Sequence, residues 1–160
     1  MRRVLSISTI VAFAACQPPA EPREEEDGPV DVAAEVGVFL ESYRAALDAR
    51  DTLGLSDLYV DDGRFIWLED GEVRYRSAAD VATSLSSLPA GMSIRTEYDE
   101  TSIRPVGAAG ASATMRFLTT MGEGPSAFEF GGVISMTMER GPEGWRIVSG
   151  HTSTAAPQRP

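Results

Sequence analysis

His151 is the residue of this chain best suited to proton transfer. It is the only histidine, and imidazole is the one side chain that titrates near neutrality without perturbation. Its strand parity matches that of Trp145 and Ile147, which predicts that it points toward the apolar face of its strand or the rim of that face. The alternative is a structural histidine that bonds to a first-helix group. A serine-histidine-aspartate triad with Ser149 or Ser153 is disfavoured, because no nucleophile elbow precedes either serine.

Cys16 is the only cysteine, and it ends a charge-free stretch that runs from Val4 to Ala15 behind two arginines. This order is typical of a bacterial lipoprotein signal, in which the cysteine is lipidated and becomes the mature N-terminus. The stretch is shorter than the ~20 residues of a spanning helix, so residues 1–15 are expected to be a cleaved signal peptide. We expect export to the bacterial cell envelope, with a lipid anchor on the periplasmic side of the outer membrane.

Two alternatives to lipidation remain open. Phe13 stands where such signals usually carry leucine, and Ala12-Phe13-Ala14 also fits an ordinary cleavage site that would leave Cys16 as an unmodified thiol. A cytosolic protein with one buried cysteine is the other alternative, but it leaves the basic and then apolar opening unexplained.

Two charged clusters invite other chemistry. Asp61-Asp62-Gly63 has the acids of a metal site, but adjacent acids before glycine are more typical of a helix end and turn, and no further ligands cluster nearby. Arg74 and Arg76 flank Tyr75, so they point to the face opposite its ring; a solvated edge strand is favoured over an anion site. We therefore expect neither a metal nor a cofactor.

Composition excludes several function classes. The formal charge is −10, and removing the signal with its two arginines makes it more negative, so the basic surface that nucleic acid binding needs is missing. All 14 cationic side chains are arginine, and without lysine there is no Schiff-base chemistry and no P-loop. One cysteine allows no intrachain disulfide and no thiolate metal cluster. The 160 residues are enough for one domain of ordinary size.

The first half of the chain favours helices behind an acidic leader. Residues 16–30 combine prolines with a run of acids and are expected to form a disordered tether. Asp31 suits an N-cap, and helical spacing after it predicts a buried stripe of Val32, Val36, Phe39, Leu40, Tyr43 and Leu47. A shorter helix is predicted from Asp51, carrying Leu55, Leu58 and Tyr59. A third begins at the capping-box spacing of Ser77 and Asp80 and stops at Pro89.

Strands are predicted around and after the third helix. The turn pair Asp70-Gly71 predicts a hairpin of residues 64–68 and 72–76. Four longer strands are predicted at 94–106, 111–121, 127–139 and 145–152. Their short, glycine-containing connections indicate an antiparallel meander. Gly131-Gly132 interrupts the longest strand and predicts a bulge that bends the sheet.

Alternation along these strands predicts one apolar face and one mixed face. Met136 and Met138 fall on the apolar face and are expected in the core rather than in a ligand site. The mixed face is expected to carry Thr114, Arg116, Leu118, Val133, Ser135, Thr137, Arg146, Val148 and Thr152. This composition suits sheet-on-sheet packing, with a hydrophobic centre at Leu118, Val133 and Val148, so we expect a homodimer.

The order of helix, helix, short strands, helix and long meander resembles the nuclear transport factor 2-like (NTF2-like) superfamily, and its SnoaL-like and DUF4440 branches in particular. Residues 43–51, with Leu58-Tyr59-Val60-Asp61-Asp62, resemble the first two helices of this superfamily. The segment 144–153 is similar to the last strand of the DUF4440 branch and of the calmodulin-dependent kinase association domain. The resemblance covers residues 31–153, leaving 154–160 as a flexible tail. It implies an α+β cone, in which a strongly curved antiparallel sheet wraps around N-terminal helices.

The resemblance also implies roles for individual residues. Tyr43 matches the first-helix tyrosine that donates a hydrogen bond to the developing oxyanion in ketosteroid isomerases. The first-strand aspartate that shuttles the proton in those enzymes corresponds here to Trp67, and an indole cannot serve as a general base. The resemblance implies a pocket lined by Tyr43, Trp67, Phe130 and His151.

We expect this pocket to bind a small, largely apolar molecule. One alternative is an isomerase, lyase or hydrolase of the SnoaL or ketosteroid-isomerase type, with His151 as base and Tyr43 as oxyanion donor. Another is a non-catalytic, structural dimer module whose cone is filled by its own side chains. The missing carboxylate at Trp67 disfavours the enzyme.

Overall fold

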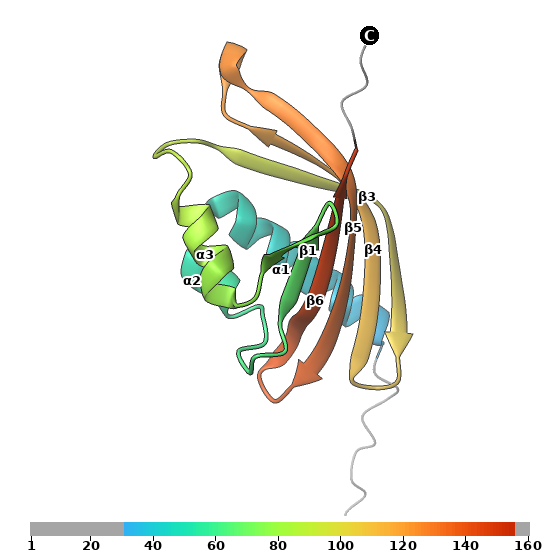
Figure 1. The fold of residues 1–160 in the computed structure, drawn as a ribbon. Coiled ribbons are helices and arrows are strands. Elements are labelled where there is room, and N and C mark those ends of the chain that lie inside the picture. The colour runs from blue at the N-terminus through green and yellow to red at the C-terminus, as the bar shows by residue number, and fades with distance from the viewer. Residues whose placement is uncertain (1–30, 156–160) are drawn as a thin grey trace, which may run out of the picture.

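A computed structural model describes residues 31–155 of the chain (Figure 1). Three helices lie on one side of a six-stranded sheet that curves around them. The predicted α+β cone is therefore confirmed. The predicted signal peptide, Cys16 and the acidic tether fall outside the described residues. No helix of residues 31–155 is long and apolar enough to cross a membrane.

The helices begin where the sequence places their caps. Asp31 accepts a hydrogen bond from the Ala34 amide at 3.1 Å, and Ser77 and Asp80 form the predicted capping box. The helices are α1 (Val32–Ala49), α2 (Thr52–Ser56) and α3 (Ala78–Ser86), and a short 3₁₀ turn, η1, spans Gly124–Ser126. α1 buries the predicted apolar stripe against the sheet, which fixes its position inside the curve.

The six strands are β1 (Ile66–Glu69), β2 (Glu72–Tyr75), β3 (Ile94–Val106), β4 (Gly110–Met121), β5 (Phe128–Gly141) and β6 (Gly144–Thr154). Their order across the sheet is β2-β1-β6-β5-β4-β3. β3 to β6 form the predicted antiparallel meander, and β1 and β2 form the predicted hairpin. β1 joins the meander by parallel pairing with β6, a contact between distant segments that brings the hairpin beside the last strand.

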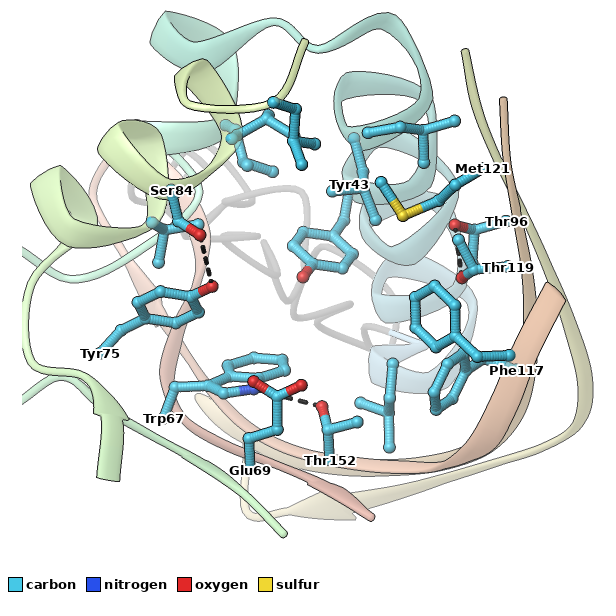
Figure 2. A pocket seen from close by; sticks show the side chains of 18 of the residues that line it. Tyr43, Trp67, Glu69, Tyr75, Ser84, Thr96, Phe117, Thr119, Met121 and Thr152 are labelled. Carbon is cyan, nitrogen blue, oxygen red and sulfur yellow. Dashed lines mark hydrogen bonds between the residues drawn. The ribbon is translucent and has the colours of Figure 1, made fainter. Parts of the chain in front are cut away.

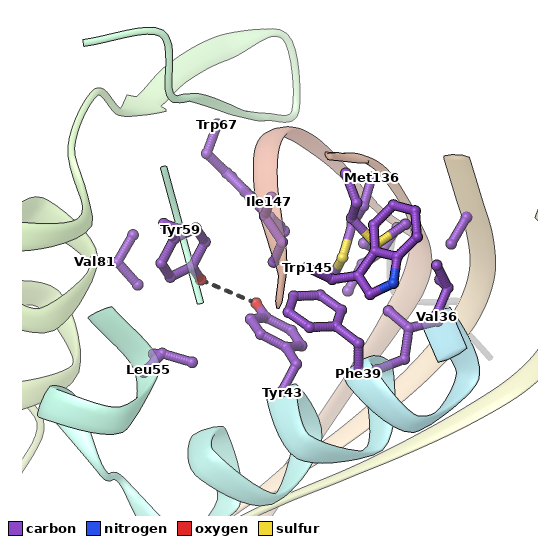
Figure 3. Packing of buried hydrophobic residues seen from close by; sticks show 14 of the residues in the cluster. Val36, Phe39, Tyr43, Leu55, Tyr59, Trp67, Val81, Met136, Trp145 and Ile147 are labelled. Carbon is purple, nitrogen blue, oxygen red and sulfur yellow. Dashed lines mark hydrogen bonds between the residues drawn. The ribbon is translucent and has the colours of Figure 1, made fainter. Parts of the chain in front are cut away.

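The core fills the concave side of the sheet between β4, β5, β6 and α1 (Figure 3). β4 alternates buried and exposed residues, and Met136 and Met138 of β5 are buried as predicted. α1 contributes Val36 and Phe39 to this core, and β6 contributes Trp145. These core contacts fix the position of α1 relative to the sheet.

The second helix is shorter than predicted. α2 ends at Ser56, a turn follows at Asp57 and Leu58, and Tyr59 then forms a parallel bridge with Ile147 of β6. The Val60 amide donates to the Ile147 carbonyl at 3.1 Å, and the Ile147 amide donates to the Leu58 carbonyl at 2.8 Å. Backbone groups that a longer helix would have used are therefore paired with the sheet instead.

The predicted bulge at Gly131-Gly132 is wrong. Both glycines pair in continuous register with β4, and Gly132 pairs without a shift with β6. Their role is close backbone approach: a Cβ on Gly132 would lie 2.0 Å from the Ser153 carbonyl oxygen, and one on Gly131 would lie 2.6 Å from that of Phe117.

Candidate functional site

A cavity of about 240 Å³ lies between α1, α3 and the concave face of the sheet (Figure 2). Its wall is mostly aliphatic and aromatic, and its aliphatic part consists of Leu47, Leu55, Val81, Leu85, Leu88, Ile94, Met121 and Ile134. An apolar cavity of about 150 Å³ already accommodates benzene in another protein. The cone is therefore not filled by its own side chains, as a purely structural module would require.

All four tyrosines of the chain line this cavity: Tyr43 from α1, Tyr59 from the segment after α2, Tyr75 from β2 and Tyr98 from β3. Each of these segments presents one phenol to the same space, and only the tertiary arrangement brings them together. Phe117 and Phe130 pack edge to face on the sheet side, with ring centroids 6.0 Å apart.

Tyr59 and Tyr43 form a buried hydroxyl pair (Figure 3). The Tyr59 hydroxyl donates to the Tyr43 oxygen at 3.3 Å, and the two rings meet edge to face at 87°. Burial raises the pKa of both phenols, so both stay protonated near neutral pH. Because Tyr43 accepts from Tyr59, its own proton is left to be donated into the cavity, where its hydroxyl points in Figure 2.

The Tyr98 hydroxyl is buried and has no hydrogen-bond partner among residues 31–155. Burial raises the pKa of this phenol as well, so it also remains a neutral donor. An unpaired buried hydroxyl costs about 1–3 kcal/mol.

Other polar groups of the wall are paired with one another. Three side-chain hydrogen bonds cross the cavity wall: Trp67 Nε1 to Thr152 Oγ1 at 3.2 Å, Tyr75 hydroxyl to Ser84 Oγ at 2.9 Å, and Thr96 Oγ1 with Thr119 Oγ1 at 3.1 Å (Figure 2). Paired in this way, these groups present little polarity to an occupant. Trp67 has room to lie over the sheet because Gly150 stands opposite it, where a Cβ would come within 2.2 Å of the indole.

Among residues 31–155, Glu69 is the one charged side chain in the cavity wall, and it was not predicted from the sequence. It lies two residues after Trp67 on β1, so its carboxylate points to the same side, beside the indole (Figure 2). Its spacing of two residues from Trp67 on a predicted strand is the sequence signal that indicates this position. Its Oε2 lies 3.3 Å from Nε of Arg74, and the Glu69 side chain is 40% exposed at the cavity mouth.

Of the four residues predicted to line the pocket, Tyr43, Trp67 and Phe130 do so, and His151 does not. His151 is exposed on the outer face, and the predicted inward direction is wrong. Thr137 and Met138 of β5 face Ser149 and Ile147 of β6, so Val148 is an extra residue that reverses the alternation.

The extra residue Val148 forms a β-bulge, and this bulge also makes a second prediction wrong. Thr152, expected on the outer face, is buried in the cavity wall in the place predicted for the histidine. A base at His151 therefore has no access to the cavity.

The two charged clusters follow the sequence prediction only in part. Asp62 accepts from Arg64 Nε at 2.8 Å and from the Arg64 amide at 3.1 Å, which lowers the pKa of its carboxyl. Gly63 takes a left-handed φ of 80°, as the predicted turn requires, but α2 ends earlier, at Ser56.

Arg74, on the edge strand β2, and Arg76, just after this strand, are exposed. The predicted direction of Arg74 is wrong, because its guanidinium lies 5.5 Å from the centroid of the Tyr75 ring. Trp67 and Leu68 of β1 pair with Tyr75 and Val73 of β2, so Arg74 is an extra residue that breaks the alternation.

Comparison with solved structures supports the fold. A candidate dehydratase of the NTF2-like family from Streptomyces avermitilis superposes with a TM-score of 0.67 at 20% identity, over 78% of this chain and 97% of that one. An NTF2-like protein with a cystatin-like fold from Novosphingobium aromaticivorans gives 0.64 at 18%, over 79% and 83%. The β subunit of benzoate 1,2-dioxygenase from Burkholderia mallei gives 0.66 at 13%, over 79% and 91%.

A search of the curated proteins finds no match. The family model for the SnoaL-like domain matches residues 36–157, which include α1 from Val36 onward, the other two helices and every strand. The structural matches show that the fold is that of NTF2-like proteins. The family match leads to one assignment: the chain belongs to the SnoaL-like domain family.

Proposed function

We propose that this protein binds a small, largely apolar molecule in the cavity of its cone. The observation that carries the proposal is the cavity itself, an unfilled space of about 240 Å³ whose polar wall groups are mostly hydrogen-bonded to each other. Burial of an apolar body there gains roughly 25 cal/mol per Å² of surface removed from water. Tyr43 supplies a hydroxyl donor for an acceptor atom on the occupant.

Native mass spectrometry of the protein purified from its own host tests this proposal. We expect a co-purifying small molecule that is released on denaturation. Leu88→Trp, which fills one end of the cavity, is expected to abolish its retention. Leu53→Trp, at a position 80% exposed on α2, is the matched control and is expected to retain it. Equal occupancy in both variants would contradict binding in the cavity.

A second candidate function is proton-transfer catalysis, and the position of Glu69 favours it. The carboxylate that the first strand lacks at Trp67 is present two residues later on the same side, and the Tyr43 hydroxyl points into the same cavity (Figure 2). Glu69 would take a proton from the carbon next to a ketone, the electron pair would move to the carbonyl oxygen, and Tyr43 would donate to that oxygen. Return of the proton to the same carbon gives exchange. In a β,γ-unsaturated ketone, return of the proton to the γ carbon, with the C=C bond moving into conjugation, completes an isomerisation.

Deuterium exchange distinguishes the enzyme from the binding protein. Small cyclic ketones incubated with the protein in deuterated buffer would exchange their α-protons faster than in buffer alone if the second candidate is correct. Glu69→Gln should then remove the enhancement, and Glu72→Gln, an equal charge change on the neighbouring strand, should preserve it. Exchange at the buffer rate would leave ligand binding as the function.

We further propose that the domain is tethered to the bacterial envelope through a lipid on Cys16. The proposal is supported by the charge-free stretch that ends at the sole cysteine and by the acidic, proline-rich residues behind it. Membrane fractionation checks it: the parent protein is expected in the detergent phase and Cys16→Ala in the aqueous phase. An alanine variant that stays in the detergent phase would exclude the lipid anchor.

A further inference from the structure

The mouth of the cavity is built around one carboxylate and two aromatic side chains. Glu69, Trp67 and Tyr75 all line the cavity, from the paired strands β1 and β2. In the described part of the chain the cavity wall holds no arginine or histidine, and its charged group is Glu69, which pairs at the mouth with the Arg74 guanidinium. An anionic end placed against the free Oε1 of Glu69 would be repelled by that carboxylate.

The polar groups beside Glu69 are already used. The indole N–H of Trp67 is donated to Thr152, and the Tyr75 hydroxyl to Ser84, so neither is directed at the carboxylate. Arg74 contacts Oε2 of Glu69 from the edge strand, and Oε1 accepts no hydrogen bond from residues 31–155. This oxygen is therefore free to accept a hydrogen bond from a donor that the occupant brings.

The aromatic faces around the carboxylate favour a cationic donor over a neutral one. A protonated amine gains a charge-assisted hydrogen bond from a carboxylate and a cation–π attraction from Trp or Tyr rings. The mouth already shows this preference within the chain, because the guanidinium of Arg74 lies 5.5 Å from the centroid of the Tyr75 ring and pairs with Glu69. The formal charge of −10 also raises the concentration of cations near the surface.

We propose that the molecule bound in the cavity is an amine, with an apolar body against α3 and the sheet and a protonated nitrogen on Glu69 at the mouth. This inference rests on the proposed ligand-binding function and names the chemical class of the ligand. The body contacts the aliphatic wall, and the nitrogen takes Oε1 of Glu69 between Trp67 and Tyr75.

Calorimetric titration with three matched probes tests the inference on the full chain. The probes are 3-phenylpropylamine, 3-phenylpropanol and 3-phenylpropionate, which share a body and differ in the charge of one end. We expect the amine to bind about tenfold more tightly than the alcohol and the carboxylate to bind more weakly than either. Added salt should weaken binding of the amine and leave that of the alcohol unchanged.

Two variants assign the preference to Glu69. Glu69→Gln is expected to reduce the affinity for the amine to that for the alcohol, and Glu72→Gln, an equal charge change on β2 outside the cavity wall, is expected to preserve the tenfold preference. The alcohol affinity serves as the control for an intact fold. If amine and alcohol bind equally to the unmodified protein, the amine proposal fails and the apolar ligand site stands. If Glu69→Gln keeps the preference, the amine proposal also fails, and if none of the probes binds, both proposals fail.

Discussion

The hydroxyl groups of the cavity are held neutral by burial. Tyr43, Tyr59 and Tyr98 each have a pKa raised above the ordinary phenol value, and desolvation is the largest cause in every case. A phenol that stays protonated donates a hydrogen bond and carries no charge, which suits an apolar cavity. Since Tyr59 donates to Tyr43, it also polarises the Tyr43 hydroxyl as a donor.

A spectrophotometric titration of the tyrosines checks this picture. The raised pKa values mean that the folded state holds these protons more tightly than the unfolded state. Their contribution to stability is therefore complete below the ordinary phenol pKa of about 10 and is lost as the pH rises through the folded-state values.

We expect the native protein to show less than half of the phenolate absorbance of the unfolded chain just above pH 10, and the free energy of unfolding to decrease from that pH upward. A Tyr43→Phe, Tyr59→Phe double variant should lose stability less steeply over the same range. Full ionisation of the native protein at the ordinary phenol value would contradict the burial of these hydroxyls.

Site residues differ in how far the sequence reveals them. Helical spacing and the resemblance predict Tyr43 and Trp67 as site residues. Glu69 was not predicted, although strand alternation places it on the same side as Trp67. Tyr59 and Tyr98 do not follow, because they lie on segments that meet only in the folded chain. The direction of His151 was predicted wrongly, because side chains alternate between the two faces of a strand only as far as the next bulge.

At the scale of elements, local sequence rules predict where helices begin and which faces are buried better than they predict which strands pair. Side chains at Asp31 and Ser77 satisfy amides within three residues of themselves, so the beginnings of α1 and α3 are readable from the sequence. The bulge at Val148 has no glycine or proline to indicate it, and valine suits a regular strand. The parallel pairing of β1 with β6 joins segments about half the chain apart, and no local pattern records it.

Arg50 connects the end of α1 to the end of α3. It occupies the left-handed cap position after α1, with a φ of 55°. From there its guanidinium donates to four backbone carbonyls around the end of α3, those of Leu85, Leu88, Pro89 and Met92, at 2.9–3.3 Å. These carbonyls lie at or just beyond the last turn of α3, where regular intrahelical hydrogen bonds end, so the arginine acts as a C-cap from a distant segment. The Leu85 and Pro89 carbonyls accept in addition from the Leu88 and Met92 amides.

Arg50→Ala should therefore loosen α3. We expect the free energy of unfolding to fall by about 1–3 kcal/mol, because four carbonyls lose one donor group. Hydrogen exchange should increase in α3 and remain unchanged in β4. Arg95→Ala is the control, since Arg95 is exposed and lies 3.6 Å from Glu97, an ion pair worth about 0–1 kcal/mol. Equal effects of the two substitutions would mean that Arg50 does not hold the helix.

At the scale of the whole molecule, the sheet has one covered face and one open face. α1, α2 and α3 lie on the concave side, and residues 31–155 place no helix on the convex side (Figure 1). Leu118 and Val133 are exposed there at 44% and 41%, on neighbouring strands, with Thr114 and Thr137 near them. The predicted membership of this face differs at two residues: the bulge at Val148 turns Thr152 into the cavity, and Val148 itself is partly buried and packs against the core.

A homodimer through the convex face is the remaining prediction, and its physical basis is the apolar pair Leu118 and Val133 within a polar surround. A twofold contact uses the same patch on both copies, so a charge placed at its centre meets an identical charge on the partner. Leu118→Asp should therefore yield monomers, whereas Leu53→Asp, on the helical side and 80% exposed, should leave the dimer intact. Light scattering on the chain from Asp31 onward, at tens of micromolar, measures both. A monomer in the unmodified protein, or a dimer that survives Leu118→Asp, would place the contact elsewhere or exclude it.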